Sequence, residues 1–294
     1  MKITARIKGG IGNQLFCYAA ARRLAIANQA DLVLDYENGF LRDFEYQQKY
    51  QLDHFNIKVS KASGPNILGW PSGRWGFYLR RKINRIIPYS RRTYIEQVGN
   101  NFDARLLGLE VKRDLYIDGY WQSEGYFYDI AKTLRADLKI KPPEDDANLR
   151  LGEKIDRSNA IAIHIRFFDK LNSVSNRNAS IDYYVNALNF IENKFPNSHY
   201  YLFSDQPQRA ISLLKFPDGR FTCVYHNIGD ENAFADLWLM SKCRHFIISN
   251  STFSWWGAWL GGAEGKIVIA PDMNISGVGS WGFEGLLPKE WIKL

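Results

Sequence analysis

Short apolar runs alternate along the chain with longer stretches that have helical periodicity. Residues 3–8 predict a strand, and a glycine-rich turn at 9–12 leads into a helix over about 13–28. Residues 32–35 predict the next strand, so the chain opens with a β-α-β unit. A less regular region follows as far as about residue 113.

The alternation becomes clearer further along the chain. Residues 115–118 predict a strand, followed by a helix that ends near 138, and the proline- and acid-rich residues 141–146 predict a linker. Beyond it, strands are expected at 160–165, 200–203, 221–225, 245–248 and 266–270, with helices at 182–195, 208–215, 232–240 and 251–260. We therefore expect two α/β halves, 1–145 and 146–294, with the final residues able to pack back on the first half.

Composition places the protein among folded, cytoplasmic proteins. Of the 294 residues, 46% are hydrophobic and 15% aromatic, which is enough for buried cores and excludes a disordered chain. No window approaches twenty apolar residues, and the N-terminus does not read as a signal peptide. The three cysteines lack metal-type spacing, which favours reduced thiols in the cytoplasm.

The net charge of +7 is concentrated in the segment 70–92. Its basic residues are Arg74, Arg80, Arg81, Lys82, Arg85, Arg91 and Arg92, and its aromatic residues include Trp70, Trp75, Phe77 and Tyr78. Such a mixture suits peripheral contact with the inner, anionic face of a membrane. Nucleic acid ranks lower because no nucleic-acid motif accompanies the segment, and a solvated basic surface is the plain structural alternative.

Three polar clusters follow predicted strands in the second half. They are His164 and Arg166 with Asp169, the pair Ser204-Asp205, and residues 250–254. Because the carboxyl ends of parallel strands converge on one crevice, these clusters predict a ligand site.

The chemistry of the clusters fits a nucleotide. The forked guanidinium of Arg166 suits a diphosphate, and the carboxylate of Asp205 can accept two hydrogen bonds from the edge of guanine. Asn250, Ser251, Thr252 and Ser254 open a helix, whose N-terminus favours anions.

Each feature also has a structural interpretation. His164 lies within an apolar strand, where a histidine is usually part of the core. Arg166 and Asp169 can pair with each other, Asp205 can cap the next helix, and residues 249–260 can form a capped, tryptophan-rich core helix. Only the coincidence of three clusters raises the nucleotide interpretation to equal weight.

The turn at 9–14 offers a second candidate wall for the site. Its glycines, Gly10 and Gly12 among them, permit close approach of a ligand, with Asn13 and Gln14 pointing toward a cleft between the halves. Leu15 stands where a dinucleotide fingerprint has its third glycine, and no Gly-Lys-Ser/Thr of a phosphate loop follows. The structural alternative is a tight turn capped by Asn13.

Together these motifs resemble those of the α-1,2-fucosyltransferases of glycosyltransferase family 11. The resemblance rests on 9–16 with Tyr18-Ala19, 119–124, His-x-Arg at 164–166, 203–205 and 250–260, in the family's order. It implies a GT-B-like fold, with two Rossmann-like α/β halves facing a central cleft. It also implies inverting transfer of L-fucose from GDP-β-L-fucose to the 2-hydroxyl of a galactoside, without a metal or other cofactor.

The resemblance also assigns roles to individual residues. Arg166 would hold the β-phosphate, and His164 and Asp205 would lie near the guanine. Asn250, Ser251, Thr252 and Ser254 would line the phosphate or fucose pocket, and Asn13 would reach the reacting centre from the acceptor half. Class and charge together favour a lipid-linked glycan such as an O-antigen unit as acceptor.

Two positions depart from the family's pattern. The usual His-x-Arg-Arg-x-Asp has Phe167 in place of its second arginine, and the usual Ser-Asp-Asp ends in Gln206. Donor binding is expected to survive, while acceptor preference and donor affinity are less secure.

For catalysis, Arg166 and the helix N-terminus near Ser251 would stabilise the negative charge that develops on the leaving diphosphate, in place of a metal ion. No Asp-x-Asp follows the apolar strands, so a metal-bridged diphosphate is not indicated. Asp169 is the motif carboxylate to test as general base, although it can instead orient Arg166. The alternatives are a glycosyltransferase that uses another GDP-sugar, a non-catalytic sugar-binding descendant and, more distantly, a nicotinamide-dependent oxidoreductase.

Overall fold

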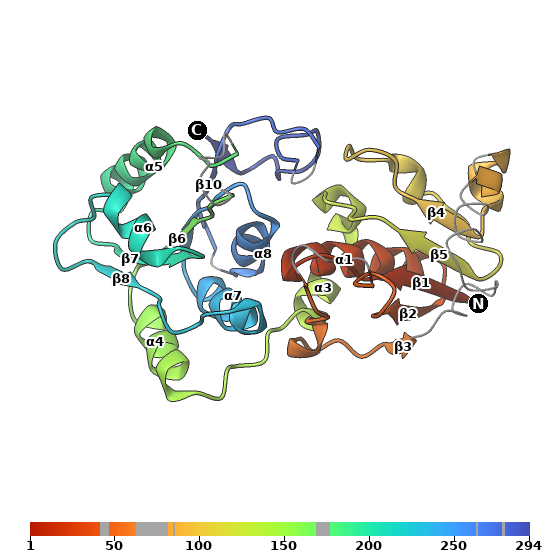
Figure 1. The fold of residues 1–294 in the computed structure, drawn as a ribbon, viewed down its shortest axis with the longest axis horizontal. Helices are drawn as coiled ribbons and strands as arrows, with labels where there is room; N and C mark the ends of the chain where they lie inside the picture. The colour runs from red at the N-terminus through yellow and green to blue at the C-terminus, as the bar shows by residue number, and fades with distance from the viewer. Residues whose placement is uncertain (42–46, 63–81, 85, 169–176, 263, 278–279) are drawn as a thin grey trace. The chain divides into compact units, whose positions relative to one another are not determined.

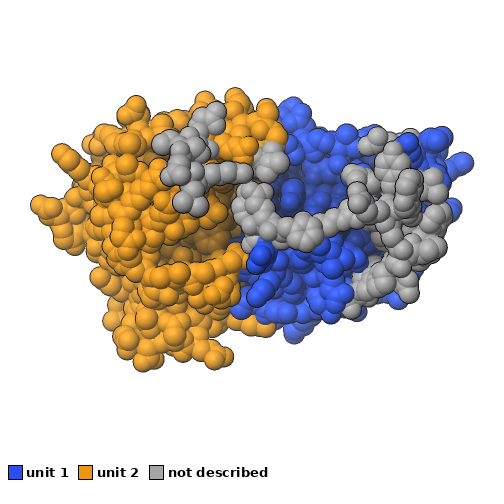
Figure 2. All heavy atoms as spheres, in the orientation of Figure 1, with its two compact units in different colours: residues 1–139, 284–286 blue, residues 140–283, 287–294 orange. Residues whose placement is uncertain are grey.

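The computed structural model describes residues 1–41, 47–62, 82–84, 86–168, 177–262, 264–277 and 280–294. The chain divides into two compact units, which Figure 2 shows in separate colours. Unit 1 comprises residues 1–139 and 284–286, and unit 2 comprises residues 140–283 and 287–294. This division falls between 139 and 140, whereas the sequence predicts the boundary between 145 and 146.

Unit 1 is built on a parallel sheet with the strand order β3-β2-β1-β5-β4 (Figure 1). The strands are β1 (Lys2–Arg6), β2 (Asp31–Asp35), β3 (Ser60–Ala62), β4 (Tyr94–Glu96) and β5 (Leu115–Asp118). The described helices are α1 (Ile11–Ala27) and α3 (Ala131–Asp137), with 3₁₀ turns at Leu52–His54, Tyr89–Arg91, Ala104–Leu106, Glu124–Tyr126 and Tyr128–Ile130. β1 lies at the centre, where Ile3 is paired with Leu32 and Leu115.

Helix α1 carries the core of unit 1. Leu15, Phe16 and Tyr18 are fully buried, and the helix is apolar on most of its sides. A helix of this kind is enclosed by protein rather than half exposed. Its first turn therefore stays fixed beside the carboxyl end of β1, where the glycine-rich turn joins the two elements.

Unit 2 contains a second parallel sheet, with the order β11-β10-β9-β6-β7-β8. The strands are β6 (Ala160–Ile165), β7 (His199–Ser204), β8 (Phe221–Cys223), β9 (His245–Ile247), β10 (Val268–Ala270) and β11 (Ile292–Lys293). The helices are α4 (Asp146–Asp156), α5 (Ile181–Lys194), α6 (Pro207–Leu213), α7 (Ala233–Ser241) and α8 (Thr252–Leu260), with a 3₁₀ turn at Asp230–Asn232. The prediction of two parallel α/β units is confirmed.

Strand β6 marks the point in the sheet of unit 2 where the order of the strands along the chain reverses. All its residues are buried, and it lies between β7 and β9. β7 and β8 extend the sheet to one side, whereas β9, β10 and β11 extend it to the other. In an open parallel sheet, ligands bind at the carboxyl ends of the strands beside such a switch point. The residues after β6 and β9 therefore occupy the place where a ligand is expected.

Helix α8 is anchored by its aromatic residues and closed by a lysine. The indoles of Trp255, Trp256 and Trp259 pack against one another. The indole of Trp255 also contacts Trp291. At the other end, Lys266 Nζ donates to the carbonyl oxygens of Ala258 and Gly261, each at 2.7 Å. A cation at this end complements the helix dipole. Across the described ranges of the chain, no helix is long and apolar enough to cross a membrane.

Candidate active site

Arg166 and Asp205 form an ion pair at the carboxyl edge of unit 2. They follow the neighbouring strands β6 and β7, whose last residues, Ile165 and Ser204, are paired in register. Arg166 Nη1 lies 3.2 Å from Asp205 Oδ2, and the backbone N–H of Phe167 donates to Asp205 Oδ1 at 3.1 Å. Asp205 therefore fixes both the side chain of Arg166 and the backbone that follows it.

The pair is only partly withdrawn from solvent. The side chain of Arg166 is 40% exposed and that of Asp205 is 24% exposed. Burial raises the pKa of Asp205, while Arg166 and the Phe167 N–H act in the opposite direction. A half-exposed guanidinium held by one carboxylate keeps donors available for a second anion.

His164 lies beneath this edge and carries no charge. Its side chain is buried, and Nδ1 lies 2.8 Å from the hydroxyl of Ser249, two residues beyond the end of β9. Burial, with a smaller contribution from Arg166, lowers the pKa of His164 to about 3. The neutral imidazole thus joins the ends of β6 and β9, as the structural interpretation predicts.

Residues 250–254 connect β9 to the first turn of α8. Ser251 caps the helix by accepting from Phe253 N at 3.3 Å, and Ser251 and Thr252 are both partly exposed. Ser254 is fully buried, and its hydroxyl donates to the Ser249 and Ser251 carbonyl oxygens. Ser254 therefore holds the turn together instead of facing a ligand, because no part of it reaches the surface.

Asn250 combines burial with an unused acceptor. It is 4% exposed, and its Nδ2 donates to the carbonyl oxygen of Arg177 at 2.8 Å. The side-chain oxygen of Asn250 has no hydrogen-bond partner within the described part of the chain. A buried amide oxygen of this kind favours a nearby donor group.

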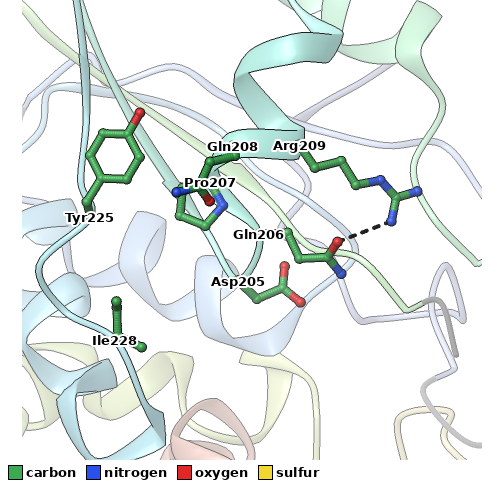
Figure 3. Close-up of a pocket in the computed structure, with 7 residues that line it drawn as sticks. All are labelled: Asp205, Gln206, Pro207, Gln208, Arg209, Tyr225 and Ile228. Carbon is green, nitrogen blue, oxygen red and sulfur yellow. Dashed lines mark hydrogen bonds between the residues drawn. The ribbon is translucent and has the colours of Figure 1, made fainter. Parts of the chain in front are cut away.

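A pocket of about 540 Å³ opens beside Asp205. Figure 3 shows its lining residues: Asp205, Gln206, Pro207, Gln208 and Arg209 from the β7–α6 junction, and Tyr225 and Ile228 from the segment after β8. The polar side chains of Asp205, Gln206 and Arg209 lie on one side of this view, with Tyr225 and Ile228 on the other. Tyr225 and Ile228 are 45% and 79% exposed. No motif in the sequence marks these two residues, since only the fold brings them to the pocket.

The two positions that depart from the family pattern lie close to this pocket. Phe167 is buried, with 6% exposure, in the apolar core of unit 2 formed by β6, β7 and α5. Gln206 lines the pocket, and its backbone N–H donates to the hydroxyl of Ser204 at 3.1 Å. Phe167 therefore packs in the core against the ends of β6 and β7, whereas Gln206 faces the pocket.

The glycine turn of unit 1 holds Asn13 at the start of α1. Gly9 adopts a φ of +76°, and a Cβ on it would lie 2.9 Å from Asn13 Cβ, so only glycine fits. Asn13 Oδ1 accepts from Gln122 Nε2 at 2.7 Å. Trp121, before Gln122, has a φ of +54°, which is unusual for a bulky residue. Asn13 is thus held at the start of α1 by Gln122, a residue of the motif at 119–124.

Gln14 has a structural role within unit 1. Its side chain is fully buried, and Nε2 donates to the carbonyl oxygens of Gly9 and Lys49, each at 2.8 Å. Its Oε1 accepts from Gln51 N at 2.9 Å. Because every polar atom of the amide is used inside unit 1, Gln14 fixes the turn and does not point toward a ligand. Gly10 is the N-cap of α1, and Gly12 is buried in its first turn.

The carboxyl edge of the unit 1 sheet contains a closed charge network. Asp118, at the end of β5, is 4% exposed and accepts from Arg6 at 2.8 Å and from Lys8 at 2.6 Å. Tyr94 OH donates to the same carboxylate at 3.0 Å. Burial acts to raise the pKa of Asp118, but the two cations outweigh it and the pKa is lowered.

Some predicted features fall beyond the described ranges. Asp169, the candidate base, lies outside them, as do Arg85 and most of the basic aromatic segment, residues 70–81. Among the residues that the structure does describe, no group of three or more histidines, cysteines and acids is placed to hold a metal ion.

Comparison with known families identifies the protein class. The family model described as glycosyl transferase family 11 matches residues 84–294. The chain belongs to glycosyl transferase family 11. The resemblance seen in the motifs is therefore confirmed, and the match covers every site residue in unit 2.

Two curated relatives come from Escherichia coli. An alpha-1,2-colitosyltransferase is 27% identical over 277 residues, covering 92% of this chain and 91% of that protein. The O-antigen biosynthesis glycosyltransferase WbnK is 29% identical over 295 residues, covering 90% of this chain and 92% of that protein. Both comparisons span unit 1 as well as unit 2.

Solved structures show the fold of this family 11 chain. The NodZ alpha-1,6-fucosyltransferase soaked with GDP-fucose matches with a TM-score of 0.51 at 16% identity, covering 88% of this chain and 92% of that one. A variant of Arabidopsis thaliana FUT1 in complex with GDP matches with a TM-score of 0.52 at 14% identity, covering 91% and 69%. These similarities support the GT-B-like fold predicted from the sequence.

Membership in family 11 establishes the chain as a glycosyltransferase. Such an enzyme moves a sugar from an activated donor to an acceptor glycan.

Proposed function

We propose that this glycosyltransferase transfers L-fucose from GDP-β-L-fucose to the 2-hydroxyl of a galactoside, with inversion, during assembly of an O-antigen-type glycan. The observation that carries the proposal is the half-exposed Arg166, fixed by Asp205 at the sheet switch point beside the pocket. A paired-donor cation in this place suits the diphosphate of a sugar nucleotide.

The pocket supports a nucleoside as the other end of the donor. Asp205 presents a carboxylate to it, and Tyr225 presents an aromatic ring. A carboxylate can pair with the two adjacent N–H donors of guanine, which adenine lacks. We therefore assign guanine to the pocket and the diphosphate to the edge near Arg166.

The linkage and acceptor are supported by the curated relatives. One relative is named for α-1,2 transfer and the other for O-antigen biosynthesis. Both relatives match along nearly the whole chain, so unit 1 is included in the similarity. We propose that unit 1 binds the acceptor, with Asn13 as a contact.

In the proposed reaction, the glycosidic bond to the diphosphate breaks as the acceptor oxygen forms a bond to the anomeric carbon. Arg166 stabilises the charge that develops on the diphosphate, together with the N-terminal N–H groups of α8. We propose that no metal takes part and that Asp169 receives the proton from the acceptor hydroxyl.

A GDP-colitose donor is the second candidate, because the colitosyltransferase matches 92% of this chain. Colitose is fucose without its 3-hydroxyl, so the two donors share every group except one. The discriminating experiment supplies both GDP-sugars with a galactoside and compares kcat/KM. A site that hydrogen-bonds the 3-hydroxyl discriminates strongly against the donor that lacks it.

The test of the main proposal is transfer by the purified protein. GDP release is measured with GDP-fucose and a galactoside, with and without EDTA, and the linkage is read by NMR. An α-1,2-fucoside formed in EDTA is the expected result. Turnover with another GDP-sugar alone contradicts the fucose assignment, and no turnover with any donor favours the non-catalytic alternative.

We also propose that the segment 70–92 contacts an anionic membrane, where a lipid-linked acceptor would lie. Among its described residues, Ile83 and Ile86 are 44% and 86% exposed beside Lys82. Apolar side chains next to cations suit a membrane surface. Binding to vesicles with and without phosphatidylserine tests this: we expect binding only to the anionic vesicles, with release at high salt and with I86D. Equal binding to both vesicle types or to neither contradicts it.

A further inference from the structure

Gln206 is the pocket residue at which this chain departs from the family pattern. It directly follows Asp205, and both residues line the pocket (Figure 3). Gln206 is partly exposed, so a ligand in the pocket can reach it. The Asp205 carboxylate, to which we assign the guanine, can only accept hydrogen bonds, whereas an amide can also donate them. The two neighbouring side chains therefore offer a ligand different hydrogen-bonding groups.

The contact with Arg209 fixes which way the Gln206 amide faces. Arg209 Nη1 donates to Gln206 Oε1 at 3.4 Å, which Figure 3 shows as a dashed line. A guanidinium has donors only, so the amide atom that faces it must be the oxygen. The amide nitrogen is therefore turned away from Arg209, and within the described ranges of the chain it donates to no other residue. Its N–H groups are available to a ligand.

The backbone of Gln206 is held on both sides. Its N–H donates to the hydroxyl of Ser204 at 3.1 Å, and its carbonyl oxygen accepts from Ala210 N at 3.0 Å. Pro207, the first residue of α6, disfavours the helical conformation for the residue before it. Gln206 accordingly lies outside the helical region, with φ −134° and ψ 73°. The amide is thus presented from a fixed junction between β7 and α6.

Guanine presents one acceptor and two donors along a single edge, namely O6, N1–H and the 2-amino group. A carboxylate can accept from both donors, and an amide N–H beside it can donate to O6. Adenine carries an amino group at position 6 and has no N1–H, so it matches neither side chain. Asp205 and Gln206 together therefore carry the complement of the whole edge of guanine.

We propose that Gln206 Nε2 donates to O6 of the guanine and sets the base specificity together with Asp205. This inference rests on the proposed GDP-sugar donor, and it adds the residue that recognises position 6 of the base. It also gives a function to the departure from the family pattern, because an amide at 206 can donate to O6 and the usual carboxylate cannot.

Calorimetry with GDP and 6-thio-GDP tests the contact in the wild type and in Q206L. 6-thio-GDP keeps both donors of the base but has sulfur, a weaker acceptor, in place of O6. The wild type should bind GDP roughly 3- to 10-fold more tightly than 6-thio-GDP, the usual effect of one neutral hydrogen bond. Q206L should lose a similar factor for GDP and much less for 6-thio-GDP, so its preference between the two should narrow.

The control variant is N193L, which also replaces an amide by leucine. Asn193 is exposed near the end of α5, shortly before β7 begins, and so lies toward the amino ends of the strands. The pocket lies at their carboxyl ends, and N193L should bind both ligands like the wild type. Because Gln206 and Asn193 are not buried, both leucine variants should unfold near the wild-type Tm.

Q206E separates contact with the base from support of Arg209. Its carboxylate still accepts from Arg209 but has no N–H for O6. Q206E should therefore bind GDP at least as weakly as Q206L does, and the same weakening should appear with guanosine, which has no phosphate to be repelled. Wild-type affinity in Q206E would show that Gln206 only positions Arg209 and would overturn the base contact.

The remaining outcomes separate this inference from the proposed function. If the wild type binds GDP but Q206L keeps the full preference for GDP over 6-thio-GDP, the O6 contact is overturned and the GDP-sugar donor stands. If the wild type prefers ADP, UDP, CDP or dTDP to GDP, or binds none of these diphosphates, both proposals fail.

Discussion

The two units place charged residues at the same edge of a parallel sheet but use them differently. In unit 1, Asp118 is buried and bound by Arg6, Lys8 and Tyr94. In unit 2, Asp205 holds Arg166 through one contact of 3.2 Å, and the side chain of Arg166 stays 40% exposed. In the first network, two cations and a tyrosine hydroxyl share one buried carboxylate. The second leaves donors available for a ligand.

This difference shows why sheet topology alone does not locate a binding site. Both sheets offer convergent strand ends, and both ends carry cations. What separates them is how deeply the carboxylate and its cations are buried. Changes in unit 2 should therefore affect activity more than stability, and changes in unit 1 should affect stability first.

The largest expected effect is the loss of activity in R166A. Removing a donor that stabilises a developing oxyanion typically lowers kcat by roughly 10²- to 10³-fold. The half-exposed side chain contributes little to folding, so Tm should change little. Steady-state kinetics with GDP-fucose, together with thermal unfolding, measure both quantities. Wild-type turnover would show that Arg166 does not contact the phosphate.

The opposite behaviour is expected for D118N. An amide of the same shape leaves Arg6 and Lys8 without their counter-charge, which should lower the free energy of unfolding by about 3 kcal/mol. Because folding lowers the pKa of Asp118, its contribution is present at neutral pH and is lost as pH falls through the folded-state pKa. Urea unfolding measures the change, and D53N, at an exposed ion pair of unit 1, is the matched control. Equal stabilities for the two variants would contradict a stabilising role for the buried Asp118 network.

A smaller, pH-dependent effect should come from His164. Its pKa in the folded protein, about 3, lies below its pKa in the unfolded chain. At a pH between the two pKa values, the unfolded chain therefore binds more protons than the folded protein. Stability should therefore fall as pH drops, by about 2 kcal/mol between pH 6.5 and pH 5. H164Q, which cannot take up the proton, should lack this component. Urea unfolding of both proteins at the two pH values gives the difference, and parallel curves would contradict the neutral, buried imidazole.

The smallest of these effects is expected for Q14A. It leaves the Gln51 N–H and two backbone carbonyl oxygens without the Gln14 amide, which should cost about 1–2 kcal/mol of unfolding free energy. The KM for the donor should not change. A selective loss of activity at wild-type stability would instead place Gln14 in the active site.

The sequence predicts the large features of the fold because they depend on local patterns. The buried run at 160–165 and the helix at 182–195 are long enough for their periodicity to show, and both appear within a residue of the predicted bounds. Strands β3, β4 and β11 have three residues or fewer and were missed, whereas the equally short β9 was predicted because its apolar residues directly precede the 249–260 motif. So few positions do not establish an alternation.

For the candidate site, too, some features could be predicted from the sequence and others could not. The proximity of Arg166 and Asp205 was predictable because strand ends converge in any parallel sheet. The burial of Gln14 and Ser254 was not, since a polar residue in a turn serves the backbone as readily as it serves a ligand. Tyr225, Ile228 and Arg209 reach the pocket only through the folding of β8 and α6 against β7.

The position of Phe167 has an evolutionary consequence. Its ring belongs to the apolar core and supports Arg209 at 4.0 Å. An arginine introduced there by one mutation would place a charge in that core directly against another cation, at a cost of several kcal/mol. The family's usual pattern is thus not accessible in a single step, and Phe167 is entrenched by its neighbour. Lineages that carry this phenylalanine should also keep the arginine of α6, and the two positions should covary.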